Sequence, residues 1–175
     1  MPVHDAMMSS PEMAGAQTIR LSEADLPRLS RLCRSCSAFY ELIEGQPASE
    51  ATAAEILGPL DPKYAPGTKH VWGVEKGDKL IAVADLLQGY PSARDWCIGL
   101  LLVDPEHRQQ GVGTRLCGAI LHWMALHGAS LVRLVVQQQN ARARTFWERQ
   151  GFTLEREDVI KSGRLESSVW ILSRK

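Results

Sequence analysis

The chain has 175 residues, of which 45% are apolar and 23% charged, the composition of a globular protein rather than a disordered or fibrous one. Its formal net charge is zero, which argues against a nucleic-acid partner bound through counterion release. No apolar stretch approaches the ~20 residues that a membrane span requires, so we expect no membrane partner.

One domain is expected for a chain of this size. Residues 1–17 contain no Lys or Arg and no long apolar run, so they lack the parts of a secretory signal. We interpret 1–16 as a flexible leader and 17–175 as a single domain, and we expect a cytoplasmic protein.

Apolar residues three and four apart predict helices, and short apolar runs between turn residues predict strands. In chain order we expect a strand at 17–21, helices at 22–39 and 49–57, strands at 71–75, 80–87 and 96–103, a helix at 112–127, a strand at 131–136, a helix at 140–150, and strands at 152–159 and 165–172. The strand-helix-strand unit over 96–136 requires a parallel pair. The fold class is therefore mixed α/β.

The four cysteines do not predict a metal site. Cys33 and Cys36 are spaced C-x-x-C, but they lie in a helical pattern, and neither a second pair nor well-spaced histidines accompany them. We interpret both as core residues, and Cys97 as a core residue of its strand rather than a nucleophile.

Charge is distributed unevenly along the chain. Residues 1–104 carry nine Lys or Arg against fourteen Asp or Glu, whereas residues 105–150 carry six arginines against two glutamates. A basic segment beside an acidic one suggests a site where an anionic ligand meets a cationic one. Chance surface charge explains the same numbers equally well.

A glycine-rich stretch, Arg108-Gln109-Gln110-Gly111-Val112-Gly113, joins the strand at 96–103 to the next helix. Backbone N–H groups and the positive end of the helix dipole make an anion site there, and a diphosphate would use several of these donors. A dinucleotide fingerprint would need a third glycine where Leu116 stands, and a Walker loop would need Gly-Lys-Ser/Thr. The remaining option is the coenzyme A loop, Arg/Gln-x-x-Gly-x-Gly/Ala.

The segment from Leu101 to Gly113 resembles the acetyl-CoA signature of the GNAT superfamily of N-acetyltransferases. A second element, Asn140-x-x-Ala143-x-x-Phe146-Trp147, is similar to the family's second segment that contacts the coenzyme. The resemblance implies a mixed, strongly twisted sheet, flanked by helices, whose two central parallel strands splay apart. These strands would be 96–103 and 131–136, with the pantetheine arm of acetyl-CoA in the gap.

The same resemblance assigns residues to the coenzyme. Backbone groups of the strand that precedes the loop would pair with the pantetheine amides, and Asn140 would bond the same arm while it caps its helix. The full expected set is Leu101, Leu102, Val103, Arg108, Gln109, Gln110, Gly111, Val112, Gly113, Thr114, Asn140, Ala143, Phe146 and Trp147.

The resemblance also implies that an amine attacks the thioester directly in a ternary complex, with no covalent enzyme intermediate. Candidate bases are Glu41, Glu44, Asp85 and Asp95, and ordinary surface or turn charge is the competing explanation for each. Trp147 stands where many relatives have the tyrosine that protonates the leaving sulfur, and an indole N–H is no useful acid.

We therefore predict an enzyme, an N-acetyltransferase that moves the acetyl group of its cosubstrate acetyl-CoA to an amine of a small molecule or peptide. The acidic first part of the chain favours a cationic acceptor. Because Trp147 replaces the tyrosine, a catalytically silent module that binds acyl-CoA is the alternative. Dimers are common in the family, so a homodimer is compatible with the sequence.

Overall fold

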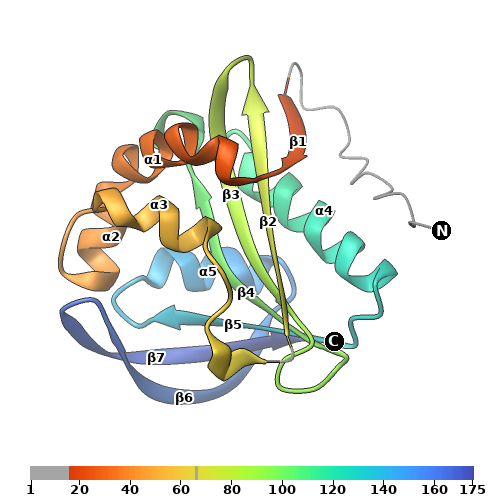
Figure 1. Cartoon of the computed structure of the whole chain (residues 1–175). Helices are drawn as coiled ribbons and strands as arrows, with labels where there is room; N and C mark the ends of the chain where they lie inside the picture. The colour runs from red at the N-terminus through yellow and green to blue at the C-terminus, as the bar shows by residue number, and fades with distance from the viewer. Residues whose placement is uncertain (1–15, 66) are drawn as a thin grey trace.

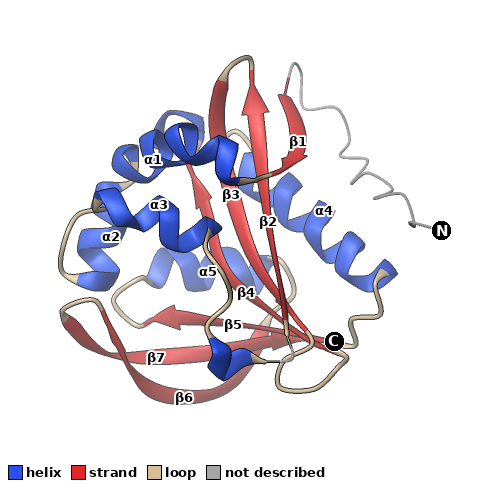
Figure 2. Ribbon diagram, viewed as in Figure 1, coloured by secondary structure: helices blue, strands red, loops and turns tan. Residues whose placement is uncertain are grey.

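A computed structural model of the chain describes residues 16–65 and 67–175, so the expected leader lies, apart from Ala16, outside the described residues. Within them, no helix is both long and apolar enough to cross a membrane. The helices and strands, shown in Figures 1 and 2, are β1 (Ala16–Arg20), α1 (Leu26–Ser35), α2 (Ser37–Glu44), α3 (Glu50–Leu57), β2 (Thr68–Lys76), β3 (Lys79–Gln88), β4 (Asp95–Val103), α4 (Val112–Leu126), β5 (Leu131–Gln137), α5 (Ala141–Arg149), β6 (Thr153–Ser162) and β7 (Leu165–Arg174).

The strands form one mixed sheet in the order β1-β2-β3-β4-β5-β7-β6, in which only β4 and β5 pair in parallel. Alternating side chains of the sheet supply two cores. One core packs against α1, α2 and α3, and the other packs against α4 and α5. Figure 1 shows α4 across the sheet from α1–α3. The predicted mixed α/β class is confirmed.

The first helix is not continuous, contrary to the prediction of one helix from 22 to about 39. A 3₁₀ turn precedes α1, and the backbone leaves helical geometry at Cys36 (φ −99°, ψ 19°) before α2 begins. The Ser35 hydroxyl donates to Leu32 O (2.8 Å), a local bond of the kind that competes with helix continuation. Cys33 and Cys36 are buried in the core beneath this break, as predicted.

The two parallel strands pair over only a short distance and then separate. Residues Asp95–Ile98 of β4 pair with Leu131–Leu134 of β5, and both strands continue beyond the last pair. On the other side of β4, Asp85 pairs with Leu100 and Leu86 with Ile98, which leaves Gly99 as the extra residue of a bulge. A bulge bends its strand and increases the local twist, so it directs the rest of β4 away from β5. The predicted splay is confirmed.

Candidate active site

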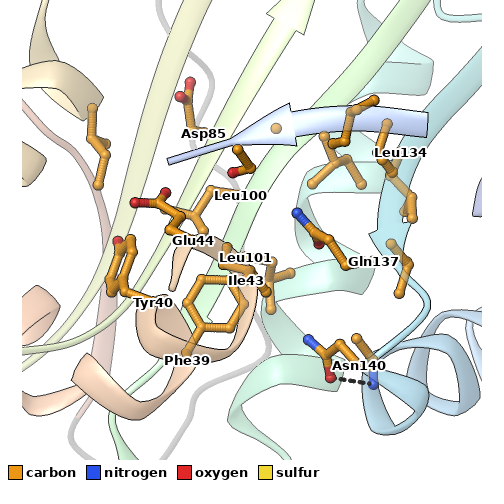
Figure 3. Close-up of a pocket in the computed structure, with 18 of the residues that line it drawn as sticks. Phe39, Tyr40, Ile43, Glu44, Asp85, Leu100, Leu101, Leu134, Gln137 and Asn140 are labelled. Atoms are coloured by element: carbon orange, nitrogen blue, oxygen red, sulfur yellow. Dashed lines mark hydrogen bonds between the residues drawn. The ribbon is translucent and has the colours of Figure 1, made fainter. Parts of the chain in front are cut away.

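A cavity of about 440 Å³ opens where β4 and β5 separate. Its walls come from α2 and α3, from β3, β4 and β5, from α5 and its N-cap, and from the end of β6. Figure 3 shows Glu44 and Asp85 on one side of this cavity, and Gln137 and Asn140 on the opposite side. Segments far apart in the sequence therefore meet around one space.

The free edge of β4 forms one wall of the gap. The Asp104 N–H donates to Ile81 O (2.9 Å), and hydrogen-bonded pairs alternate along an antiparallel ladder. The backbone groups of Leu102 therefore face β3, whereas those of Leu101 and Val103 face the side of β5. Leu102 is 2% exposed and lies in the core beneath α1–α3, so it does not face the gap that was expected to hold pantetheine.

The glycine-rich loop ends at the start of α4. Gly111 is the N-cap of this helix in the left-handed conformation (φ 76°), with no side chain capping the helix. The first helical bond runs from the Arg115 N–H to Gly111 O (3.0 Å). The N–H groups of Val112, Gly113 and Thr114 therefore point out of the helix end, as donors to an anion.

Two arginines flank these donors. Arg108 turns back to the end of β4, where its Nε donates to Val103 O (3.0 Å). Arg115 donates to Gln110 O (2.9 Å). Gln109 and Gln110 are exposed, and Gln109 has a positive φ (60°). The loop is thus positively charged and held to the strand before it.

The second predicted coenzyme segment lies beside the loop. A Cβ on Gly113 would lie 3.6 Å from Phe146 Cε2, which places the ring of α5 next to the start of α4. Asn140 caps α5, because its Oδ1 accepts the Ala143 N–H (3.2 Å), and both residues line the cavity. Trp147 is 7% exposed, also lines the cavity, and packs edge-on against Phe146.

The candidate bases fall into two groups. Glu44 and Asp85 line the cavity. Glu41 lies on the exposed side of α2 and does not line the cavity, and Asp95 lies at the start of β4, where it pairs with Arg133 (3.2 Å). The structure therefore brings two of the four carboxylates together.

The two candidate bases in the cavity both have a raised pKa. Burial raises the pKa of the Asp85 carboxyl to about 6, although the Lys69 ammonium, 3.5 Å away, lowers it. The pKa of Glu44 is raised by burial and by the nearby carboxylate of Glu55, which lines the same cavity. Asp85 thus changes protonation close to neutral pH, as a proton acceptor must.

Asp104, Glu106 and His107 form a second polar cluster, just before the loop in sequence. The side-chain atoms of these residues that could bind a metal ion lie within 4.8 Å of one another. Lys79 Nζ lies 3.2 Å from the carboxylate of Asp104 and 2.9 Å from that of Glu106, so a cation already pairs with both acids. These contacts tie the β2–β3 hairpin to the segment before α4.

The model of the Acetyltransferase (GNAT) family matches residues 36–152, from the end of α1 to the start of β6. This chain belongs to the GNAT family of acetyltransferases. Membership implies transfer of an acetyl group from acetyl-CoA. A search of the curated proteins finds no match to this sequence.

Solved structures of acetyltransferases share the fold. An acetyltransferase from Thermus thermophilus is 23% identical over 89% of this chain and 95% of its own, with a TM-score of 0.67. The ribosomal-protein-S18-alanine N-acetyltransferase of Escherichia coli is 19% identical over 90% and 92%, with a TM-score of 0.63. The PaiA N-acetyltransferase of Thermoplasma acidophilum, solved in complex with coenzyme A, is 20% identical over 91% and 98%, with a TM-score of 0.67. At these identities the likeness shows the fold alone.

In this GNAT chain, several residues in or beside the cavity wall carry no sequence signal. Lys69, Glu55 and Ser162 come from β2, α3 and β6, and no motif connects them. Two features of the sequence could have indicated the region around the bulge. Asp85 is a charge within an apolar strand, and Gly99 is an isolated glycine in a strand, a position that often marks a bulge.

Proposed function

We propose that this chain is an enzyme that transfers the acetyl group of acetyl-CoA to an amine by direct attack in a ternary complex. One observation carries the proposal: the gap between β4 and β5 has outward-pointing N–H groups of a helix start near one end and three carboxylates in the wall of its cavity. A thioester carrier with a diphosphate and an amine acceptor fit these two parts.

The backbone would hold the coenzyme. N–H groups of Val112, Gly113 and Thr114 bind the diphosphate, together with the positive charge of Arg108 and Arg115. The pantetheine arm carries amides, so it can pair with the edge of β4 that faces the gap, as an added strand does. Phe146 and the Asn140 amide lie beside this path.

The chemistry then requires a neutral amine. Asp85 accepts the proton of the bound ammonium, and the amine nitrogen attacks the thioester carbon. A backbone N–H at the edge of β4 stabilises the negative charge that forms on the carbonyl oxygen. The attacking nitrogen loses its second proton to solvent water, and collapse of the intermediate breaks the carbon–sulfur bond and releases a thiolate. A thiol with a pKa of about 8.5 leaves without an acid, so the indole at Trp147 is compatible with turnover.

The charges of the cavity favour a cationic acceptor. Three carboxylates line it, those of Glu44, Glu55 and Asp85, and the one cation paired with them among the described residues is Lys69. Glu44 and Glu55 have no ion-pair partner within 4.0 Å among these residues. A positively charged acceptor would supply the missing partner.

The test is CoA release from acetyl-CoA, measured with and without amines. We expect 1,4-diaminobutane and a lysine-containing peptide to stimulate release more than benzyl alcohol or an uncharged amide, which serve as controls. Tight binding of acetyl-CoA without release for any acceptor would support the silent acyl-CoA-binding module instead. If cationic amines and amines that carry an additional carboxylate stimulated release equally, the preference for a cationic acceptor would be wrong. Acetyl transfer to amines would still stand.

A further inference from the structure

Two hairpins of the sheet end in the same two-residue turn. Gly77-Asp78 joins β2 to β3, Gly163-Arg164 joins β6 to β7, and both glycines have a φ of 57°. A Cβ on Gly77 would have nothing within 4 Å. A Cβ on Gly163 would lie 2.6 Å from Glu44 Cβ and 2.7 Å from Glu44 O. The second turn therefore packs against another element, whereas a side chain at Gly77 would meet open space.

The element under the β6–β7 turn is the C-terminal end of α2 (Figure 1). The Arg164 N–H donates to Glu44 O (2.8 Å), and Gln139 Nε2 donates to Leu42 O (3.2 Å). The same Gln139 amide donates to Ser167 Oγ on β7 (3.0 Å). Carbonyls at a helix end have no intrahelical partner, so the hairpin and the β5–α5 loop supply partners that hold the last turn of α2.

The same contact joins two walls of the cavity. Helix α2 contributes Tyr40, Ile43 and Glu44 to its lining, and β6 contributes Ile160 and Ser162. A side chain on Gly163 would push against backbone and Cβ atoms of Glu44, which cannot rotate away as the tip of a side chain can. Displacement of the turn and displacement of the Glu44 carboxylate are therefore coupled.

We propose that the β6–β7 turn positions α2 for acceptor binding, and that Gly163 is the residue that allows this seating. The role rests on the proposed function, because it assigns α2 to the acceptor side of the site. Gly163 acts through Glu44 and the neighbouring wall, whereas the proposed coenzyme loop leads into the start of α4.

The experiment compares Gly163→Ala with Gly77→Ala. Both variants place alanine in a turn with the same φ, so they share the backbone strain and differ in what the new Cβ meets. For Gly163→Ala we expect the KM for 1,4-diaminobutane, or for the panel amine with the highest turnover, to rise ~10-fold. The Kd for acetyl-CoA should stay within ~2-fold of wild type. Gly77→Ala should leave both constants unchanged.

Hydrogen exchange gives a readout that does not depend on turnover. Amides of 37–45 should exchange faster in Gly163→Ala than in Gly77→Ala, whereas amides of 112–126 should be equal in the two variants. If Gly163→Ala does not fold, Gln139→Ala is the alternative, because it removes one hydrogen bond to the same helix end. For this variant we expect the acceptor KM and the exchange rates of 37–45 to rise ~2–3-fold.

Equal acceptor KM and equal exchange in the paired variants would overturn the positioning role. Failure of the proposed function is separable from this result. If wild type acetylates no amine but the exchange of α2 still differs between the variants, the contact stands and the acetyl-transfer proposal falls. If wild type turns over and the variants behave alike, only the positioning role falls.

Discussion

The two halves of the proposed site are built from different kinds of groups. The proposed coenzyme half is mostly backbone: N–H groups at the start of α4 and the edge of β4 at Leu101 and Val103. The proposed acceptor half is mostly side chains: Glu44 from α2 and Asp85 from β3 line the cavity, and Lys69 from β2 pairs with Asp85. A backbone site depends on local geometry, so it tolerates many side chains. A side-chain site depends on single residues.

This difference sets the size of the expected effects. Where one carboxylate performs the proton transfer, its removal should cost most of the activity. Where several N–H groups share an anion, a substitution must distort the backbone or add a negative charge to have a comparable effect. The variants that follow test each half with a control from the same element or the same residue type.

Asp85→Asn should have the largest effect. The amide cannot accept the ammonium proton, so kcat/KM for the amine should fall ~100-fold or more, while the Kd for acetyl-CoA stays within a few-fold. Stability should change in the opposite direction. The pKa of Asp85 is about 6 in the folded protein and lower in the unfolded chain, so its ionisation destabilises the fold as pH rises between about 4 and 6. The Asn variant should therefore have a higher Tm than wild type at pH 8, with a free energy of unfolding larger by about 1–3 kcal/mol. At pH 4 the two proteins should have the same Tm.

Asp95→Asn is the matched control, because Asp95 is a strand aspartate that pairs with Arg133 outside the cavity. We expect its kcat/KM to stay within ~3-fold of wild type, since a partly exposed ion pair contributes little. If Asp95→Asn lost more activity than Asp85→Asn, the assignment of the base from the cavity would be wrong.

Gly111→Asp should weaken acetyl-CoA binding ~100-fold. The change places a side chain at a left-handed φ of 76° and a carboxylate among donors meant for phosphate. Calorimetric titration with acetyl-CoA measures the loss. Gly113→Ala is the control, because Gly113 lies inside α4 and its Cβ would meet Val103 Cγ2 of β4 at 3.5 Å, an ordinary van der Waals distance. Its Kd should change less than ~3-fold, and equal losses in the two variants would contradict the role of the Gly111 conformation.

The same contrast explains what the sequence could predict. The proposed coenzyme loop is contiguous and its geometry requires glycine at fixed positions, so the pattern from Arg108 to Gly113 was enough to predict it. The candidate bases could not be ranked from the sequence. Glu41 and Glu44 are three residues apart, and only their position around the helix axis decides which one faces the cavity. That position depends on the break at Cys36, and neither Pro nor Gly marks this break. The bulge decides the position of Asp85 in a similar way, through a pairing of two strands.

Lys69→Met tests the electrostatics of the acceptor half. Lys69 favours the ionised form of Asp85, so its removal should raise the pKa of Asp85 above about 6. A base acts when deprotonated, so the acid limb of kcat/KM against pH should move upward by about one unit. Lys79→Met is the control, since Lys79 pairs with Asp104 and Glu106 at the other end of the same hairpin. An acid limb that moves equally in both variants would exclude Lys69 as the specific partner.

Trp147→Tyr should have the smallest effect on turnover. A thiolate leaves without an acid, so restoring the hydroxyl that many relatives carry should change kcat less than ~2-fold. Trp147→Phe is the matched control, because the two variants have nearly the same ring and differ in one hydroxyl. Both should lose about 1 kcal/mol of stability, since each leaves space in a core position that is 7% exposed. The ratio of kcat between Tyr and Phe isolates proton donation from packing. A ratio near one means unassisted departure of the thiolate, and a ratio well above one means that donation to sulfur limits the wild-type enzyme.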